Sequence, residues 1–188
     1  MEIVDQFNYL SHILNFNLDD ENDVEAKLNK FYGSSNSIFR NFSNVNIGTL
    51  LYLFNSFCTP QYGLALWCSK NIFVKQNFRA FHIAFCKSLK KIIGCPSYSS
   101  NHVVAEICQQ LLLNHRVTQI QTKYLNRLIN SKHEIVLINN YFVKHGRLAK
   151  HLMEILKQKY HVNLYDNDID AIISRIQWMQ ANEQYIML

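Results

Sequence analysis

The segment that decides the fold is at residues 74–94 and reads VKQNFRAFHIAFCKSLKKIIG. At about 100° per residue, its large apolar side chains fall within one helical sector roughly 80° wide. These side chains are Val74, Phe78, Phe81, Phe85, Leu89 and Ile92. Cations occupy the adjoining faces, and the segment contains no acid to pair with them. We therefore expect one side of this helix to enter a core while another presents positive charge to solvent or to a partner.

Residues at both ends of this segment predict where the helix begins and ends. Ser69 can act as its N-cap, so the helix is expected to run from about Lys70 to Ile93. Gly94 and Pro96 follow in the order that is typical of a helix C-terminus, because glycine adopts the left-handed conformation readily and proline cannot continue the helix.

Two more helices are expected on its N-terminal side. Asn46 can cap a helix from residue 47 to about residue 58, which Pro60 would break or kink. Earlier, an acidic run at residues 19–25 suits the positive end of a helix dipole and precedes one apolar stripe of roughly 20 residues. The stripe consists of Val24, Leu28, Phe31, Ser35, Ile38 and Phe42.

The ends of the chain carry weaker patterns. Residues 3–14 read as one or two short strands, with Phe7, Tyr9, Ser11 and Ile13 on one face. A further helix is expected from Ser99-Ser100-Asn101 through Leu112. Shorter helical runs are expected up to about residue 130 and then at 134–143, 146–160 and 168–181. With only 5 Gly and 2 Pro, the predicted class is mainly α: a helical bundle with a short N-terminal strand or hairpin. The predicted divisions are residues 1–15, 16–130 and 131–188.

Charge is segregated along the chain. Between Lys27 and His133 there are 13 basic residues and one acid, Glu106, whereas the whole chain has a net charge of +5. A surface of one sign attracts polyanions, and cations interleaved with Phe and Tyr are the side chains that nucleic-acid binders use. The alternative is a solvated cationic surface that only maintains solubility.

The cysteines and the hydropathy pattern bear on location. The five cysteines have no Cys-x-x-Cys spacing and sit among apolar residues, so we interpret them as reduced core thiols. The acidic start, MEIVD, does not resemble a signal peptide. The uncharged run at 41–69 is interrupted by Asn55, Ser56, Pro60 and Gln61, which favours a buried helix pair over a membrane span. An intracellular protein of the nucleus or cytoplasm, without membrane contact, is therefore expected.

Motifs for catalysis or metal binding are weak. Asp19-Asp20 suggests a polymerase metal site, but it runs into further acids that open a helix, so we interpret it as a capping segment. Residues 166–170 imitate half of an EF-hand loop, but Ala171 and Gln177 replace the required Gly and Glu. The histidines and cysteines lack zinc-site spacing, and no glycine-rich phosphate loop occurs. No catalytic residue, metal ligand or cofactor is predicted.

Five segments occur in a suggestive order. They are FNYLSHIL at 7–14, IFRNF at 38–42, LYLFNSFC at 51–58, YGLALW at 62–67 and AFCKSLKKIIGCP at 84–96. Their order resembles the tail of non-LTR (LINE-type) retrotransposon reverse transcriptases, which comprises the end of the palm, the thumb and a connector. Members of that family show a Phe-x-Tyr-Leu-Gly strand, a Leu-Tyr-x-x-Phe helix ending near Tyr-Gly-x-x-x-Trp, and a basic helix ending in Leu-Gly-x-Pro.

The resemblance covers about residues 5–115, just over half of the chain. It implies that the first strand, with Tyr9, Leu10 and Ser11, belongs to a primer grip, and that the helices form a thumb that holds an RNA–DNA duplex. Ser11 stands where the family has Gly, which matters for close backbone approach. The family's catalytic Asp-Asp hairpin would precede residue 1, so this chain is not expected to polymerise by itself.

The leading hypothesis is a non-catalytic, thumb-like fragment that binds template-primer nucleic acid through backbone contacts. The predicted phosphate contacts are Lys75, Arg79, Lys87, Lys90 and Lys91, with Lys27, Lys30 and Arg40 as secondary contacts. One alternative is a stand-alone helical protein-interaction module without a nucleic-acid role, whose basic face meets an acidic protein or the acidic ends of a second copy. Another is a polymerase completed by a second polypeptide that supplies the palm and fingers.

Overall fold

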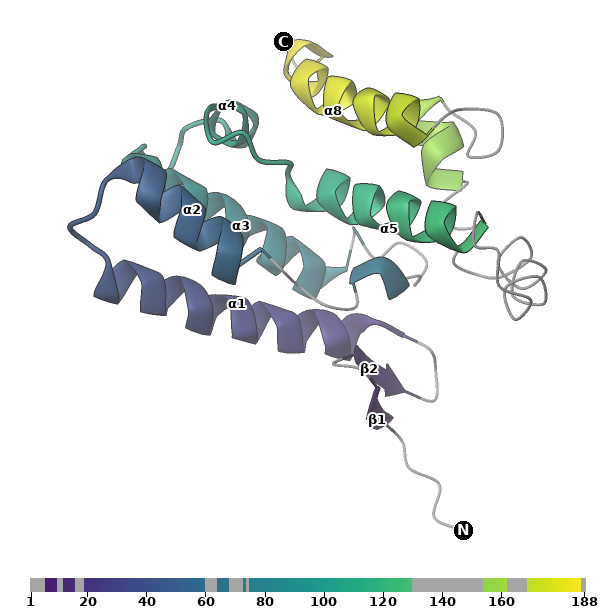
Figure 1. The fold of residues 1–188 in the computed structure, drawn as a ribbon, viewed down its shortest axis with the longest axis horizontal. Coiled ribbons are helices and arrows are strands. Elements are labelled where there is room, and N and C mark those ends of the chain that lie inside the picture. The colour runs from purple at the N-terminus through teal and green to yellow at the C-terminus, as the bar shows by residue number, and fades with distance from the viewer. Residues whose placement is uncertain are drawn as a thin grey trace. The chain divides into compact units, whose positions relative to one another are not determined.

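The structure is a computed structural model that describes residues 6–9, 12–15, 19–59, 64–67, 73, 75–129, 154–161 and 169–186. These residues are mainly helical, with one antiparallel two-stranded hairpin near the N-terminus, which confirms the predicted fold class (Figure 1). The chain forms two compact units. The first comprises Met1–Gly63 and Asn71–Leu112, and the second comprises Leu64–Lys70 and Leu113–Leu188. This division falls at Leu112, whereas the sequence indicated a boundary near residue 130.

The hairpin of the first unit consists of β1 (Gln6–Tyr9) and β2 (His12–Asn15). Phe7 pairs with Leu14, and Asn8 pairs with Ile13. Because directly opposed residues share a face of an antiparallel pair, Phe7 and Ile13 lie on opposite faces. The expectation of one continuous face through Phe7, Tyr9, Ser11 and Ile13 was wrong, since the segment forms two paired strands and not a single one.

Helix α1 (Glu21–Asn41) has the stripe that its sequence predicts. Val24, Leu28, Phe31, Ser35 and Ile38 are all buried. Phe42 is the exception: it is the C-cap residue, its amide donates to the Ile38 carbonyl, and its side chain is 40% exposed. The stripe therefore ends one turn before the sequence pattern suggested, because the helix itself ends at Asn41.

Helix α2 (Ile47–Phe57) begins where the sequence indicates. The Asn46 side chain accepts a hydrogen bond of 2.8 Å from the Thr49 amide, which confirms the predicted N-cap. The helix buries Leu50 and Phe54, and it carries no charged residue. Pro60, which was expected to break this helix, lies outside the described residues.

Helix α3 (Gln76–Ile93) is shorter than expected. It starts six residues after Lys70, with Lys75 at the N-cap position in an extended conformation, and Ser69 lies outside the described residues. Its end matches the prediction, because Gly94 has φ +70°. The amides of Gly94 and Cys95 donate to the carbonyls of Lys91 and Lys90, the pair of bonds that defines a Schellman motif.

Aromatic rings hold the three helices together. Phe31 of α1 is almost fully buried, and its ring centroid lies 5.9 Å from that of Phe54 on α2. It lies 5.3 Å from the Phe81 ring and 6.2 Å from the Phe85 ring, both on α3. The apolar face of α3 is buried as predicted from Phe78 to Ile92, while Val74 lies outside the described residues.

Helix α4 (Asn101–Ile107) completes the first unit and ends earlier than the predicted Leu112. Cys108 is its C-cap, and Gln109 has φ +53°, so the chain turns before Leu112. Cys58, Cys86 and Cys108 are buried, as predicted for core cysteines, whereas Cys95 is only half-buried. Burial raises the pKa of the Cys58 and Cys86 thiols to about 11, which leaves them poor nucleophiles at neutral pH.

The second unit is built on α5 (Leu113–Ile129), which packs against the short 3₁₀ helix η1 (Leu64–Leu66) and against α8 (Ile169–Ile186). The Gln121 side chain donates to the Trp67 carbonyl inside this unit. A π-helical turn, η3 (Leu156–Tyr160), falls in the predicted run 146–160, and the predicted run 134–143 lies outside the described residues. Within the described ranges, no helix is long and apolar enough to cross a membrane.

Candidate nucleic-acid interface

The acids around the start of α1 meet the start of α3. Lys75 Nζ lies 3.3 Å from Asp19 Oδ2 and 3.2 Å from Glu21 Oε2, and these carboxylates raise the pKa of Lys75. The two helices run in parallel, so their first residues come together although they are more than 50 positions apart in sequence. Lys75, predicted as a phosphate contact without an acidic partner, is therefore already neutralised inside the protein.

A buried ionic cluster joins the hairpin to α1 at the same end. His12 Nδ1 lies 2.9 Å from Asp23 Oδ2, and His12 Nε2 lies 3.6 Å from Asp20 Oδ1. Asp20 and then Asp23 raise the pKa of His12 to about 9, against the smaller effect of burial, so the imidazole is charged at neutral pH. Asp23 Oδ1 also accepts from the Ile13 amide at 3.0 Å and from Lys27 Nζ at 2.9 Å.

This cluster of His12, Asp20, Asp23 and Lys27 has two positive and two negative charges, all buried. It is therefore self-compensating, as buried charges must be. Asp20 occupies the N-cap position, as predicted, but its side chain makes no capping hydrogen bond. In the part of the chain that the structure describes, no cluster of His, Cys, Asp and Glu could hold a metal ion. We conclude that Lys27 is a structural residue of the hairpin junction.

Lys90 is also engaged within the protein. It is buried, and its ammonium donates a hydrogen bond of 2.8 Å to the Ser97 carbonyl. Ser97 lies in the turn that follows the Schellman motif, so Lys90 fastens this turn to the last part of α3. Lys90 does not face solvent as the neighbouring cations do, although all were predicted from one basic run.

The remaining predicted cations are exposed. Arg79, Lys87 and Lys91 are exposed on α3, and Lys30 and Arg40 are exposed on α1. Lys91 Nζ lies 4.3 Å from the centroid of the Phe39 ring, and this contact joins the C-terminal ends of the two helices. Lys30 precedes Phe39 by nine residues, or about 180° of helix, so it points to the opposite side of α1.

We define the basic face as Arg40, Arg79, Lys87 and Lys91. Among the described residues, none of these four side chains forms a salt bridge. The sequence has no acid between Lys27 and Ala105, so no carboxylate from α2, α3 or the second half of α1 can compensate the face. All four are exposed, and they extend along the unit: Arg79 precedes Lys91 by about 18 Å on α3 and lies about 120° around the helix from it.

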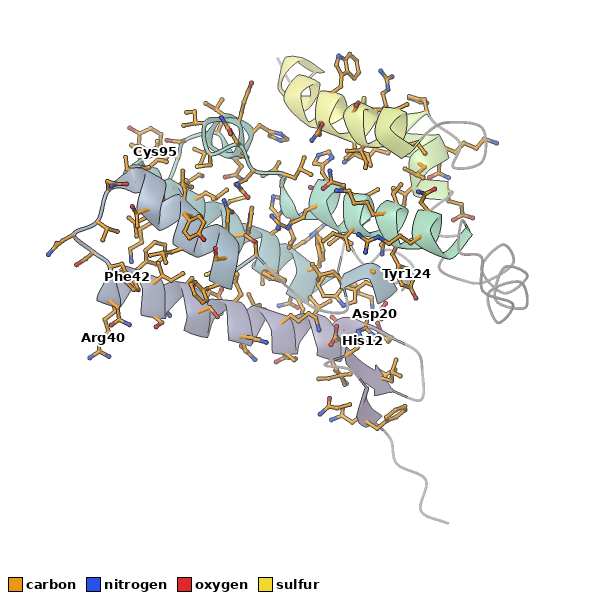
Figure 2. The ribbon with its side chains drawn as sticks, in the orientation of Figure 1. His12, Asp20, Arg40, Phe42, Cys95 and Tyr124 are labelled. Carbon is orange, nitrogen blue, oxygen red and sulfur yellow. The ribbon has the colours of Figure 1, made fainter. Side chains whose placement is uncertain are left out.

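Most acids of the first unit lie around the start of α1, whereas Arg40 and Lys91 lie near the C-terminal ends of α1 and α3; Glu106 is exposed on α4. Figure 2 shows His12 and Asp20 at one end of α1, and Arg40 and Phe42 at the other. A helix of 21 residues is about 30 Å long, so the acids at the start of α1 lie too far away to screen Arg40 and Lys91 in water. Arg79 lies one turn after Lys75 and is therefore nearer to these acids. The two ends of the unit therefore present different electrostatic potentials to a partner.

The remaining predicted site residues are only partly described. Tyr9 pairs with His12 in the hairpin register, and its side chain is outside the described set, as are Leu10 and Ser11. The cations of the second unit include Lys123 and Arg127, which are exposed on α5. Arg116 is half-buried, and burial lowers its pKa. The basic stretch of the sequence is therefore divided between two units.

Exposed aromatic residues at the cationic end were missed by the sequence reasoning. Tyr98, in the turn after α3, is 89% exposed, and Phe42 is partly exposed at the end of α1. The available signal for Tyr98 was its position among Pro96, Ser97, Ser99 and Ser100, a composition that is typical of a surface turn.

No family model, curated protein or solved structure matches this chain.

Proposed function

We propose that the first unit is a thumb-like helical module that binds duplex or hybrid nucleic acid and performs no catalysis itself. The observation that carries the proposal is the basic face: four exposed cations without a carboxylate partner among the described residues. Three of them, Arg40, Lys87 and Lys91, lie in the C-terminal halves of α1 and α3, away from the acids around the start of α1. The resemblance of residues 5–115 to the tail of non-LTR retrotransposon reverse transcriptases supports this choice of polyanion. In such a protein the palm and fingers would come from another polypeptide segment.

The chemistry of the basic face suits phosphate contact. Its arginines and lysines project from rigid helices, and Lys91 is steadied by the Phe39 ring. Cations of this kind bind the nucleic-acid backbone with little sequence preference, and binding weakens steeply as salt rises. Lys27, Lys75 and Lys90 are excluded from the proposed contact set, because each is committed to a partner inside the protein. Lys30 is a peripheral contact at most, since it lies about 15 Å before Arg40 along α1.

The test is a charge reversal with a matched control. Lys87→Glu/Lys91→Glu reverses two charges on the basic face, and Lys123→Glu/Arg127→Glu makes the same charge change on exposed positions of α5 in the second unit. Fluorescence anisotropy with a labelled RNA–DNA duplex at low salt measures affinity, and circular dichroism verifies folding. We expect the first variant to bind about tenfold or more weakly and the control to remain within about threefold of wild type. Equal affinity of Lys87→Glu/Lys91→Glu and wild type would exclude the basic face as the binding surface.

In the protein-interaction alternative, the basic face would meet an acidic protein or the acidic ends of a second copy. An apolar interface would instead need a continuous apolar surface on the bundle. Helix α2 exposes Ile47, Tyr52 and Phe57, but these residues are spaced by five positions, or about 140° of helix, and so form no common stripe. Self-association that is insensitive to salt, in a protein that does not bind the duplex, would support this alternative instead.

A further inference from the structure

The turn after α3 holds one tyrosine almost entirely in solvent. The Ser99 amide donates to the Pro96 carbonyl at 3.1 Å, which closes a four-residue turn with Ser97 and Tyr98 at its centre. Three further bonds fix this turn to α3: Lys90 Nζ donates to the Ser97 carbonyl, and the amides of Cys95 and Gly94 donate to the last carbonyls of the helix. Tyr98 is therefore an exposed ring on a well-anchored turn.

Exposure of this degree has no structural explanation within the first unit. A tyrosine that supports the fold buries most of its ring, whereas Tyr98 is 89% exposed. The ring adds nothing to the core, so it is available for contact with something outside the unit.

The surroundings of Tyr98 favour a nucleic-acid partner. Its turn adjoins the last part of α3, where Lys87 and Lys91 are exposed. The contact between Lys91 and the Phe39 ring brings the end of α1, with Arg40 and the partly exposed Phe42, to the same end of the unit. Figure 2 likewise shows Arg40, Phe42 and Cys95 at one end. Aromatic rings beside cations, with no acid between them, form the side-chain combination that binds unpaired nucleotides, since bases stack on rings while cations contact the backbone.

We propose that this end of the first unit binds the single-stranded part of a nucleic acid, with an unpaired base stacked on Tyr98 and a second aromatic contact at Phe42. The proposal rests on the proposed function and extends it: the preferred ligand is a duplex that continues into a single strand. The duplex backbone contacts the basic face along α3, and the unpaired nucleotides reach the turn. Stacking is tolerant of sequence because every base has an aromatic face, so the preference is for unpaired structure and not for a base sequence.

The experiment compares two probes and three variants of the full chain. The probes are a blunt RNA–DNA duplex and the same duplex with a single-stranded overhang, each fluorescently labelled and titrated by anisotropy. Tyr98→Ala removes the proposed stacking ring. Tyr52→Ala is the matched control, because Tyr52 is 70% exposed on the charge-free helix α2. Lys87→Glu/Lys91→Glu tests the basic face in parallel.

Wild type is expected to bind the overhang probe at least about fivefold more tightly than the blunt probe, because one stacked base adds that much affinity. Tyr98→Ala should lose this preference and keep its blunt-duplex affinity, while Tyr52→Ala should keep both. Equal affinity of wild type for the two probes, or an undiminished overhang preference in Tyr98→Ala, would overturn the inference. The proposed function fails separately, if Lys87→Glu/Lys91→Glu binds both probes as tightly as wild type.

Discussion

Two neighbouring lysines of α3 are predicted to have opposite roles. Lys90 is buried and donates a charged hydrogen bond of 2.8 Å to the Ser97 carbonyl, whereas Lys87 is exposed one turn earlier. We consider Lys90→Met and Lys87→Met, because methionine retains most of the apolar stem and removes the ammonium. Comparing the two variants distinguishes a cation that stabilises the fold, Lys90, from one that is available to a ligand, Lys87, although both belong to the same basic segment.

The magnitude follows from the contact. A hydrogen bond with a charged donor contributes about 1.5–3 kcal/mol to stability, and a cation in the last turn of a helix adds about 0.3–1 kcal/mol through the helix dipole. Ser97 is exposed, so water can replace the lost donor at its carbonyl. We therefore expect Lys90→Met to lower the free energy of unfolding by about 1.5–3 kcal/mol. Lys87→Met should change it by less than about 0.5 kcal/mol, as an exposed substitution does.

Urea denaturation followed by circular dichroism measures both variants. Tryptophan fluorescence follows the second unit separately, because Trp67 and Trp178 both belong to it. Binding should show the reverse order: Lys87→Met weakens the affinity for a blunt RNA–DNA duplex, and Lys90→Met leaves it within about twofold of wild type. The reasoning is refuted if the two variants are equally stable, or if Lys90→Met alone weakens duplex binding in a folded protein.

Three further predictions concern the architecture of the first unit. Phe31→Ala should lower the free energy of unfolding by about 3–5 kcal/mol in urea denaturation, because it empties the centre of the aromatic core, while Phe57→Ala, at an exposed ring, should cost less than about 0.5 kcal/mol. The ionic cluster predicts that the free energy of unfolding falls by at most about 3 kcal/mol as pH rises from about 6.5 to about 9. The reason is that His12 keeps its proton over this range in the folded protein and loses it in the unfolded chain. In His12→Gln this decline should disappear. Gly94→Ala should lower the free energy of unfolding by about 1–2 kcal/mol, because Gly94 has a positive φ. Gly33→Ala should raise the thermal midpoint by adding helix propensity, since Gly33 is in helix α1 and no atom lies within 4 Å of the added Cβ. Equal effects of the two substitutions would contradict the assigned backbone conformations.

Local signals predicted much of the first unit. The apolar stripes of α1 and α3, the Asn46 cap and the Gly94 terminus follow from helical period and from capping chemistry. The start of α3 was not predictable in this way. Lys75 occupies the N-cap position and bonds to Asp19 and Glu21, which are more than 50 positions away. A contact over this distance in sequence cannot be predicted from the residues that neighbour Lys75.

The candidate site shows the same limit. Charge counting identified the cations but treated Lys27, Lys75 and Lys90 like Arg79 and Lys87. The structure separates them through partners that no spacing rule indicates, such as the carbonyl of Ser97 in the turn after α3. Tyr98 was overlooked because a single aromatic residue in a turn is common, and only its exposure beside the basic face makes it informative.

The most direct test of the central claim is the salt dependence of duplex binding. The logarithm of the association constant of the full chain for a blunt RNA–DNA duplex is plotted against the logarithm of salt concentration. If the basic face contacts phosphates, affinity falls steeply with salt, and Lys87→Met/Lys91→Met reduces the slope by about two, at about 0.9 per phosphate contact. An affinity that does not depend on salt, or the same slope in the variant and in wild type, would contradict the account.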